Sequence, residues 1–296
     1  MSLAVRVLEP GTRRHYDLPL PHANWNEPPG CKENPVEFEN KVALVTGAAG
    51  SIGKGIARRF CQQGASVFIT DLRQAEVDKV CEELASAGAR CKGLAGDVTI
   101  AEDVRRIVAA AVGAFGGLID VLVNVAGTVG KGAKVEDLAE ESWDQVFAVN
   151  CKGTFLFIKE VVPIMKAGGG GKIVNFSSKS GKTGSALMSA YSAAKAAIIG
   201  LTEALAYELA KDNINVNCVC PGITADTGVW RNVSADYVKT MHLPMDEVVK
   251  KFTAKVPMGR LAEVEDVVAV TVFLASRGAD YMTGQAINIT GGREMH

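Results

Sequence analysis

Residues 41–53 read Lys-Val-Ala-Leu-Val-Thr-Gly-Ala-Ala-Gly-Ser-Ile-Gly, and a helical pattern follows as far as residue 63. The apolar run before Gly47 has the length and the β-branched content of a short buried strand. Glycines permit the tight turn that comes next and let a phosphate approach the backbone, while the start of the helix offers unpaired N–H groups. A strand, a glycine turn and a helix in this order predict a dinucleotide site in an α/β domain.

The next strand-like run, residues 65–71, ends in the carboxylate of Asp71. A carboxylate at this place can accept hydrogen bonds from the hydroxyls of a ribose and would repel a 2′-phosphate. The sequence therefore favours NAD over NADP as the cofactor. The nearby Arg73 favours the opposite preference, because an arginine can accommodate that phosphate.

Strand-like runs alternate with helical patterns along the rest of the chain. Such alternation predicts a parallel sheet that is covered by helices on both faces. We therefore expect a single doubly wound α/β domain of the Rossmann type with about seven strands. Ligands of such domains bind at the carboxyl ends of the strands. After the first strand, the strand-like runs are 66–71, 90–96, 119–125, 172–177, 214–219 and 286–290.

A second motif, Tyr191-Ser-Ala-Ala-Lys195, lies in a predicted helix over 189–213. Residues four apart share one face of a helix, so the phenol and the ammonium can meet at one site. A free tyrosine titrates near pH 10, and an adjacent cation that favours the phenolate would lower its pKa. This pair therefore predicts a general acid/base. Ser178 follows the strand-like run 172–177, so its hydroxyl could hold a substrate oxygen beside the start of that helix.

Together these motifs resemble those of the short-chain dehydrogenase/reductase family, over residues 38–294. The resemblance implies a catalytic tetrad in which an asparagine holds a proton-relay water. Its members here are Asn150, Ser178, Tyr191 and Lys195. It also implies a set of cofactor contacts that follow the strand ends along the chain. These residues are Gly47, Ser51, Ile52, Gly53, Asp71, Leu72, Asp97, Val98, Asn124, Ala126, Gly127, Tyr191, Lys195, Pro221, Gly222, Ile223 and Thr224.

The glycine spacing departs from the usual pattern of the family's ordinary-length branch. TGxxGxxG, with Gly50 in the fifth place and Ser51 in the sixth, is typical of the extended branch, which contains nucleotide-sugar epimerases and dehydratases. The roughly 260 residues from Glu37 onward suffice for one doubly wound domain without a second substrate domain. We therefore favour the ordinary branch and keep an epimerase or dehydratase as a rival. A redox-sensing or structural dinucleotide binder is a further alternative.

The substrate is expected to be a secondary alcohol or a ketone. The segment Ser178-Lys-Ser-Gly-Lys182, the segment 255–260 and the run 283–292 resemble the sugar-alcohol members, notably sorbitol-6-phosphate dehydrogenases. Lys179 and Lys182 lie next to Ser178, where an ammonium could hold a sugar phosphate or a carboxylate. An unphosphorylated polyol, a cyclic alcohol and a 3-oxoacyl thioester remain alternatives. Residues 223–257 are expected to form a small helical lid over the nicotinamide.

Composition excludes several other classes. Hydrophobic residues make up 48% of the chain and charged residues 22%, and the net charge is −1, so we expect neither nucleic acid nor a membrane as a partner. The seven irregularly spaced cysteines suit a reducing cytoplasm. The histidines show no spacing typical of metal ligands, and no metal is expected. The family resemblance implies a homotetramer.

Residues 1–38 hold most of the ten prolines and few apolar runs. They lack the apolar segment of about 7–15 residues that a signal peptide needs. We therefore expect an irregular N-terminal arm, followed by the dinucleotide-binding domain over 39–296.

Overall fold

The computed structural model describes residues 37–228, 230, 234, 238 and 242–295. The predicted N-terminal arm lies outside the described residues, apart from Glu37 and Phe38. The same holds for much of the predicted lid between residues 229 and 241. The ring of Phe38 packs edge-on against Phe60 at a centroid distance of 4.9 Å, so this residue belongs to the packing of the domain.

The seven strands form one parallel sheet in the order β3-β2-β1-β4-β5-β6-β7, which confirms the predicted fold class. The first two strands are buried throughout, as expected of strands that helices cover on both sides. The bounds are β1 (Val42–Thr46), β2 (Ser66–Thr70), β3 (Cys91–Gly93), β4 (Val121–Asn124), β5 (Gly171–Phe176), β6 (Ile214–Pro221) and β7 (Ala286–Ile289).

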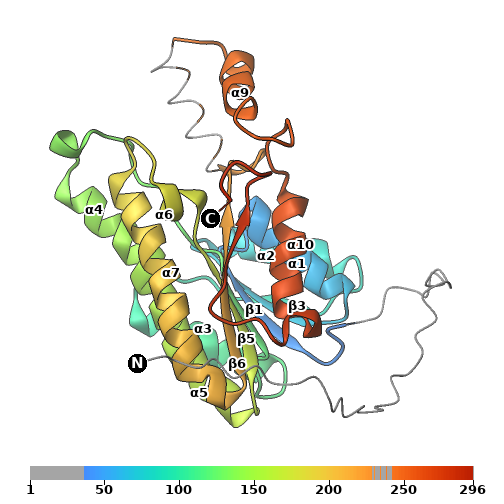
Figure 1. Ribbon diagram of the computed structural model, residues 1–296. Coiled ribbons are helices and arrows are strands. Elements are labelled where there is room, and N and C mark those ends of the chain that lie inside the picture. The colour runs from blue at the N-terminus through green and yellow to red at the C-terminus, as the bar shows by residue number, and fades with distance from the viewer. Residues whose placement is uncertain (1–36, 229, 231–233, 235–237, 239–241, 296) are drawn as a thin grey trace, which may run out of the picture. The chain divides into compact units, whose positions relative to one another are not determined.

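Helices cover the two faces of the sheet and build a separate apolar core on each (Figure 1). On one face lie α1 (Ser51–Gln62), α2 (Gln74–Ala85) and α10 (Val264–Ala275). On the other face lie α3 (Ala101–Ala114), α5 (Gly153–Ala167) and α7 (Ser189–Leu209). Among the described residues, no helix is both long enough and apolar enough to cross a membrane.

Shorter elements lie at the edges of these layers. Helix α4 packs against α7 through Val146, Ala190 and Ala194. Helix α9 belongs to the lid and forms a small apolar cluster of its own with Leu261 and Trp230. The bounds are α4 (Glu140–Phe147), α6 (Lys179–Thr183), α9 (Met245–Thr253), the 3₁₀ turns η1 (Val135–Asp137), η3 (Ala210–Asp212) and η4 (Arg277–Ala279), and the π turn η2 (Ala148–Lys152).

The strand order reverses at β1, because the chain first builds outward to β2 and β3 and then returns to place β4 on the other side. At such a switch point, neighbouring strands lead into loops that diverge and leave a crevice outside their carboxyl ends. The loops after β1 and β4 flank this crevice. The fold therefore places the glycine turn and the segment 125–127 side by side.

The glycine turn is closely packed against this second loop. Gly47 has a φ of 63°, and a Cβ atom on it would lie 2.8 Å from the Cα atom of Ala126. A Cβ atom on Gly53 would lie 2.4 Å from the carbonyl oxygen of Gly47. Because both obstacles are backbone atoms, a side chain at either position would force the turn to change shape.

We expect Gly53→Ala to lower the free energy of unfolding by about 1–3 kcal/mol, since the new methyl group has no room against the Gly47 carbonyl. Gly113→Ala is the matched control, because this exposed glycine in α3 has nothing within 4 Å of the added atom. The control should be stabilised by up to about 1 kcal/mol through helix propensity. Urea unfolding of both variants measures the difference. Equal effects would contradict this account of the turn.

Candidate active site

The start of α1 and the end of β2 together form a cradle for a dinucleotide. Gly50 precedes the helix, and no side chain caps its first turn, so the first N–H groups remain available to a phosphate. The carboxylate of Asp71 accepts hydrogen bonds from the backbone N–H of Ala49 at 2.9 Å and of Leu72 at 2.8 Å. These bonds fix the carboxylate beside the glycine turn. The close-packed glycines, the uncapped helix and this acid fit a bound dinucleotide.

The loop after β3 contains Asp97 and Val98, two of the cofactor contacts that the family resemblance implies. Asp97 accepts a hydrogen bond from Thr99 N at 2.8 Å, and its own N–H donates to Asp103 at 2.8 Å. Val98 is buried, whereas the side chain of Leu72 is 64% exposed at the end of β2. An exposed apolar side chain beside Asp71 provides a surface on which a flat base can lie.

Asn150 lies in the π turn η2 between α4 and α5 and is 1% exposed. Its Nδ2 donates to the carbonyl oxygens of Thr128 and Val146, each at 2.8 Å. Its Oδ1 has no hydrogen-bond partner among the described residues. A Cβ atom on Gly127 would lie 2.8 Å from this Oδ1 and 3.3 Å from Lys195 Nζ. The absence of a side chain on Gly127 thus keeps the amide oxygen and the ammonium facing one small space.

Tyr191 and Lys195 occupy one face at the start of α7, as the spacing predicts. Tyr191 is hydrogen-bonded to Ser178, and the Lys195 Nζ lies 5.7 Å from the centroid of the Tyr191 ring. That Nζ donates to the carbonyl oxygen of Phe176 at 2.8 Å, and Ser177 Oγ donates to the Lys195 carbonyl oxygen at 2.7 Å. Two hydrogen bonds therefore fasten the catalytic turn of α7 to the end of β5.

The electrostatics of this pair differ from the sequence-based expectation. Burial raises the pKa of the Tyr191 phenol, and the hydrogen bond with Ser178 opposes only part of that rise. Burial also lowers the pKa of Lys195 to about 8. The expected lowering of the Tyr191 pKa by Lys195 is thus wrong for this structure, because burial is the largest influence on each group and disfavours its charged form. Burial in the site therefore disfavours both the phenolate of Tyr191 and the ammonium of Lys195.

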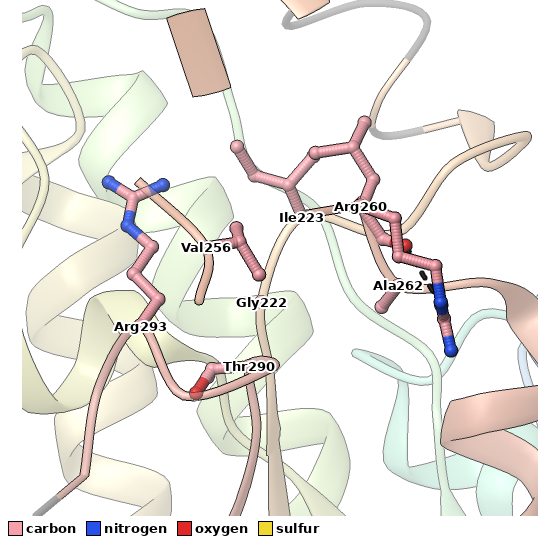
Figure 2. A pocket seen from close by; sticks show the side chains of 8 residues that line it. Gly222, Ile223, Val256, Arg260, Ala262, Thr290 and Arg293 are labelled. Atoms are coloured by element: carbon pink, nitrogen blue, oxygen red, sulfur yellow. Dashed lines mark hydrogen bonds between the residues drawn. The ribbon is translucent and has the colours of Figure 1, made fainter. Parts of the chain in front are cut away.

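The segment after β6 closes the site from the other side. Gly222 N donates to Ile289 O at 2.9 Å, and Thr224 pairs with Ala262 where the lid returns to the domain. Figure 2 shows the small cavity between Gly222 and Ile223, the segment 260–262 and the C-terminal segment with Thr290 and Arg293. Thr224 is buried in this pairing, with its Oγ1 3.4 Å from the Gly222 carbonyl oxygen, so the structure places it in the base of the lid.

The expected cofactor residues otherwise lie at the carboxyl ends of the strands, around one crevice. Two contacts at this edge were not anticipated from the sequence. Ser51 Oγ donates to the backbone carbonyl of Asp226 at 2.9 Å, which links the glycine turn to the lid. Lys182 Nζ donates to the carbonyl oxygen of Ala286 at 2.8 Å, which ties α6 to β7. Neither contact has a signal in the local sequence, because its partner lies more than a hundred residues away.

The lowered pKa of Lys195 generates a prediction about stability. The unfolded chain keeps this proton up to about pH 10.4, whereas the folded protein releases it near about pH 8. The unfolded state binds more protons between these values, so the free energy of unfolding should rise with pH from about 8 to 10, by at most ~1.4 kcal/mol per pH unit. Lys195→Met should lack this rise, and the exposed-site control Lys211→Met should keep it. Urea unfolding at a series of pH values measures the slopes, and equal slopes for both variants would contradict the assignment.

Comparison with known proteins extends the resemblance across the whole domain. Residues 47–294 match a family model described as Enoyl-(Acyl carrier protein) reductase. The galactitol 2-dehydrogenase of Agrobacterium fabrum is 39% identical over 261 residues, which cover 88% of this chain and 100% of that protein. The matched region therefore spans the glycine turn, the tetrad and the last strand.

Two solved structures share this architecture. NAD+-bound xylitol dehydrogenase has a TM-score of 0.82 at 33% identity, and the match covers 86% of this chain and 100% of that chain. A structure of actinorhodin polyketide ketoreductase with NADPH has a TM-score of 0.83 at 37% identity, and the match covers 86% of this chain and 98% of that chain. With its Asn150, Ser178, Tyr191 and Lys195 gathered at the carboxyl edge of the sheet, the chain belongs to the short-chain dehydrogenase/reductase family and is an oxidoreductase that acts on CH–OH groups.

Proposed function

We propose that the protein is an NAD-dependent dehydrogenase that oxidises a secondary alcohol of a sugar alcohol or its phosphate, and reduces the corresponding ketone in the reverse direction. The observation that carries this proposal is the placement of Ser178, Tyr191 and Lys195 at the strand ends, with Lys195 next to Gly127 in the loop that packs on the glycine turn. The relatives named galactitol 2-dehydrogenase and xylitol dehydrogenase support the sugar-alcohol class.

The tetrad suits proton transfer at one oxygen atom. Ser178 and Tyr191 hydrogen-bond the hydroxyl of the substrate, and Tyr191, as the phenolate, accepts its proton. The bound nicotinamide supplies the acceptor for the hydride that leaves the same carbon. The Lys195 ammonium stabilises the phenolate and binds the nicotinamide ribose. In the reverse direction Tyr191 donates the proton to the oxygen of the reduced carbonyl.

Asn150 connects this centre to solvent. Its unpartnered Oδ1 and the Lys195 Nζ face the space that Gly127 leaves open, where a water molecule can bridge them. A proton taken up by Tyr191 can then pass along Lys195 and this water. The raised pKa of Tyr191 makes such a route useful, because a buried phenol that has accepted a proton does not release it readily at neutral pH.

The preference for NAD follows from the end of β2. Asp71 is held in place by two backbone N–H groups beside the glycine turn, where it can accept hydrogen bonds from a ribose. Arg73, which favoured NADP in the sequence, is paired with the carboxylate of Glu76 in the first turn of α2. The cation that would bind a 2′-phosphate is thus already engaged, and the carboxylate that would repel the phosphate is in position.

The alternatives differ in substrate or in the fate of the cofactor. A 3-oxoacyl thioester or a cyclic alcohol would use the same tetrad, and the similarity to a polyketide ketoreductase favours the first of these. A nucleotide-sugar epimerase or dehydratase would retain its cofactor through turnover. A homotetramer in the cytoplasm is proposed with the enzyme. Exposed apolar side chains that support such an assembly are Phe155 on α5, Tyr207 on α7 and Tyr281 before β7.

The proposed reaction predicts that NADH forms when the purified protein is mixed with NAD and a hexitol, a pentitol or one of their phosphates, as followed by near-ultraviolet absorbance. Tyr191→Phe should lose at least about 100-fold in kcat because the proton acceptor is missing, yet bind NAD with nearly unchanged affinity. Activity with thioesters or cyclic alcohols alone would discard the substrate class. Activity retained by Tyr191→Phe would discard the mechanism.

The cofactor assignment predicts that Asp71→Ala raises the KM for NAD and lowers that for NADP. Loss of a charged hydrogen-bond acceptor and of a repulsive charge should shift the NAD/NADP ratio of kcat/KM toward NADP by about 10- to 100-fold. Asp71→Asn keeps the shape of the side chain and serves as the conservative comparison. A native enzyme that already prefers NADP would show that the reading of Asp71 is wrong.

A further inference from the structure

A group of basic side chains lies next to the catalytic serine, and the proposed reaction does not use it. Lys179 follows Ser178 directly and is close enough to Arg293 and Lys255 for their charges to interact with its own. Glu294 is the one carboxylate that acts on Lys179 in the same way among the described residues. The charges of Arg293, Lys255 and Glu294 therefore all act on Lys179, and together the four groups carry a net positive charge.

The ammonium of Lys179 is held in place without being neutralised. Its Nζ donates a hydrogen bond to the hydroxyl of Ser185 at 3.0 Å, and no carboxylate of the described residues forms a salt bridge with it. Burial and the charge of Arg293 lower the pKa of this lysine. Lys182, the other candidate in this segment, is bonded to the Ala286 carbonyl and does not share this environment. The half-buried ammonium of Lys179 is thus attracted by Glu294 but forms no salt bridge with a described residue.

Arg293 approaches the same region from the C-terminal segment. Its side chain is only 19% exposed, and Nε contacts a carboxylate oxygen of Glu294 at 3.2 Å. The terminal guanidinium nitrogens have no hydrogen-bond partner among the described residues. In Figure 2 the guanidinium of Arg293 lies on the opposite side of the cavity from that of Arg260. Arg260 is satisfied, because both its terminal nitrogens bond Asp266, at 2.6 and 2.9 Å.

The backbone fixes the position of Arg293 in advance. The carbonyl oxygen of Glu294 accepts hydrogen bonds from Asn288 Nδ2 at 3.1 Å and from Thr290 Oγ1 at 3.0 Å, and Glu294 N donates to Thr290 Oγ1 at 3.2 Å. These bonds fold the C-terminal segment back on the end of β7. Arg293 also lines the cavity that contains Gly222, at the turn where the nicotinamide is expected. The side chain of Arg293 is therefore held on the wall of the cavity that adjoins Gly222.

We propose that Lys179 and Arg293 form a subsite for an anionic substituent, a phosphate or a carboxylate, on the alcohol substrate. The planar fork of an arginine matches the oxygens of either group, and the lysine adds a point charge from the other side. This inference rests on the proposed dehydrogenation at Ser178 and Tyr191. It assigns the enzyme to acidic sugar alcohols rather than to neutral ones.

The test compares substrates that share one carbon skeleton. A hexitol, its terminal phosphate ester and the corresponding aldonate are assayed with NAD on the full-length protein and on Lys179→Met, Arg293→Gln and Arg293→Lys. The control is Arg277→Gln, which removes an exposed arginine in η4, at the amino-terminal end of β7 and far from the site. The control corrects for the change in overall charge.

We expect the native enzyme to have a lower KM for one anionic substrate than for the hexitol. Lys179→Met and Arg293→Gln should each raise that KM by about 10- to 100-fold, while the KM for the hexitol changes less than about twofold. Arg293→Lys should have a KM for the anionic substrate between those of the native enzyme and Arg293→Gln. Arg277→Gln should have the KM values of the native enzyme. Preference for the phosphate or for the aldonate identifies the anion. Equal losses on neutral and anionic substrates would overturn the subsite, as would a native preference for the hexitol.

Binding distinguishes failure of this inference from failure of the proposed reaction. Thermal unfolding is followed with saturating NAD, alone and together with the hexitol phosphate or the aldonate. A rise in Tm that Arg293→Gln abolishes and Arg277→Gln retains supports the subsite even if no polyol is oxidised. An equal rise in both variants, or none in the native protein with either anion, would overturn the subsite even if the hexitol is a substrate.

Discussion

The parallel pairing of β1, β4 and β5 is the constraint on which the rest of this site depends. Thr46 pairs with Asn124, and Asn124 pairs with Asn175, so the three strands end at one level. Everything that follows them emerges at the same edge: the glycine turn after β1, the segment ending at Gly127 after β4, and Ser178 after β5. A shift of one strand by a residue would turn its inward side chains to the other face and separate these groups.

Buried polar contacts transmit this alignment to the catalytic helix. Asn124 Nδ2 donates to Asn175 Oδ1 at 2.9 Å, and Asn175 Nδ2 donates to Thr202 Oγ1 in α7 at 3.1 Å. Together with the bonds from Lys195 and Ser177, they fix α7 both along its length and about its axis. Buried amides that lack partners are costly, so alternative positions of the helix are disfavoured. Precise placement of Tyr191 therefore comes from the interior of the sheet.

The same burial sets the charge balance of the site. Burial of Lys195 and partial burial of Tyr191 disfavour both the ammonium and the phenolate in this structure. A chemical step that forms the phenolate thus depends on charges brought close to it, and in the proposed subsite Lys179 and Arg293 would add positive potential. Proton transfer and recognition of an anion would then draw on one electrostatic field.

The sequence by itself determined the parallel α/β fold, the glycine turn, Asp71 and the spacing of Tyr191 and Lys195, because each rests on local periodicity or on residues within one or two turns of chain. It did not determine the π turn that contains Asn150 or the hydrogen bond from Ser51 to Asp226. It also did not determine the hydrogen bond from Lys182 to β7 or the interaction between the charges of Arg293 and Lys179. Nor did it determine the direction in which the Tyr191 pKa shifts. The helical spacing predicted that Lys195 lowers this pKa, whereas burial raises it. Only the tertiary structure decided these, since burial and contacts between distant segments follow from packing and leave no mark on the local pattern.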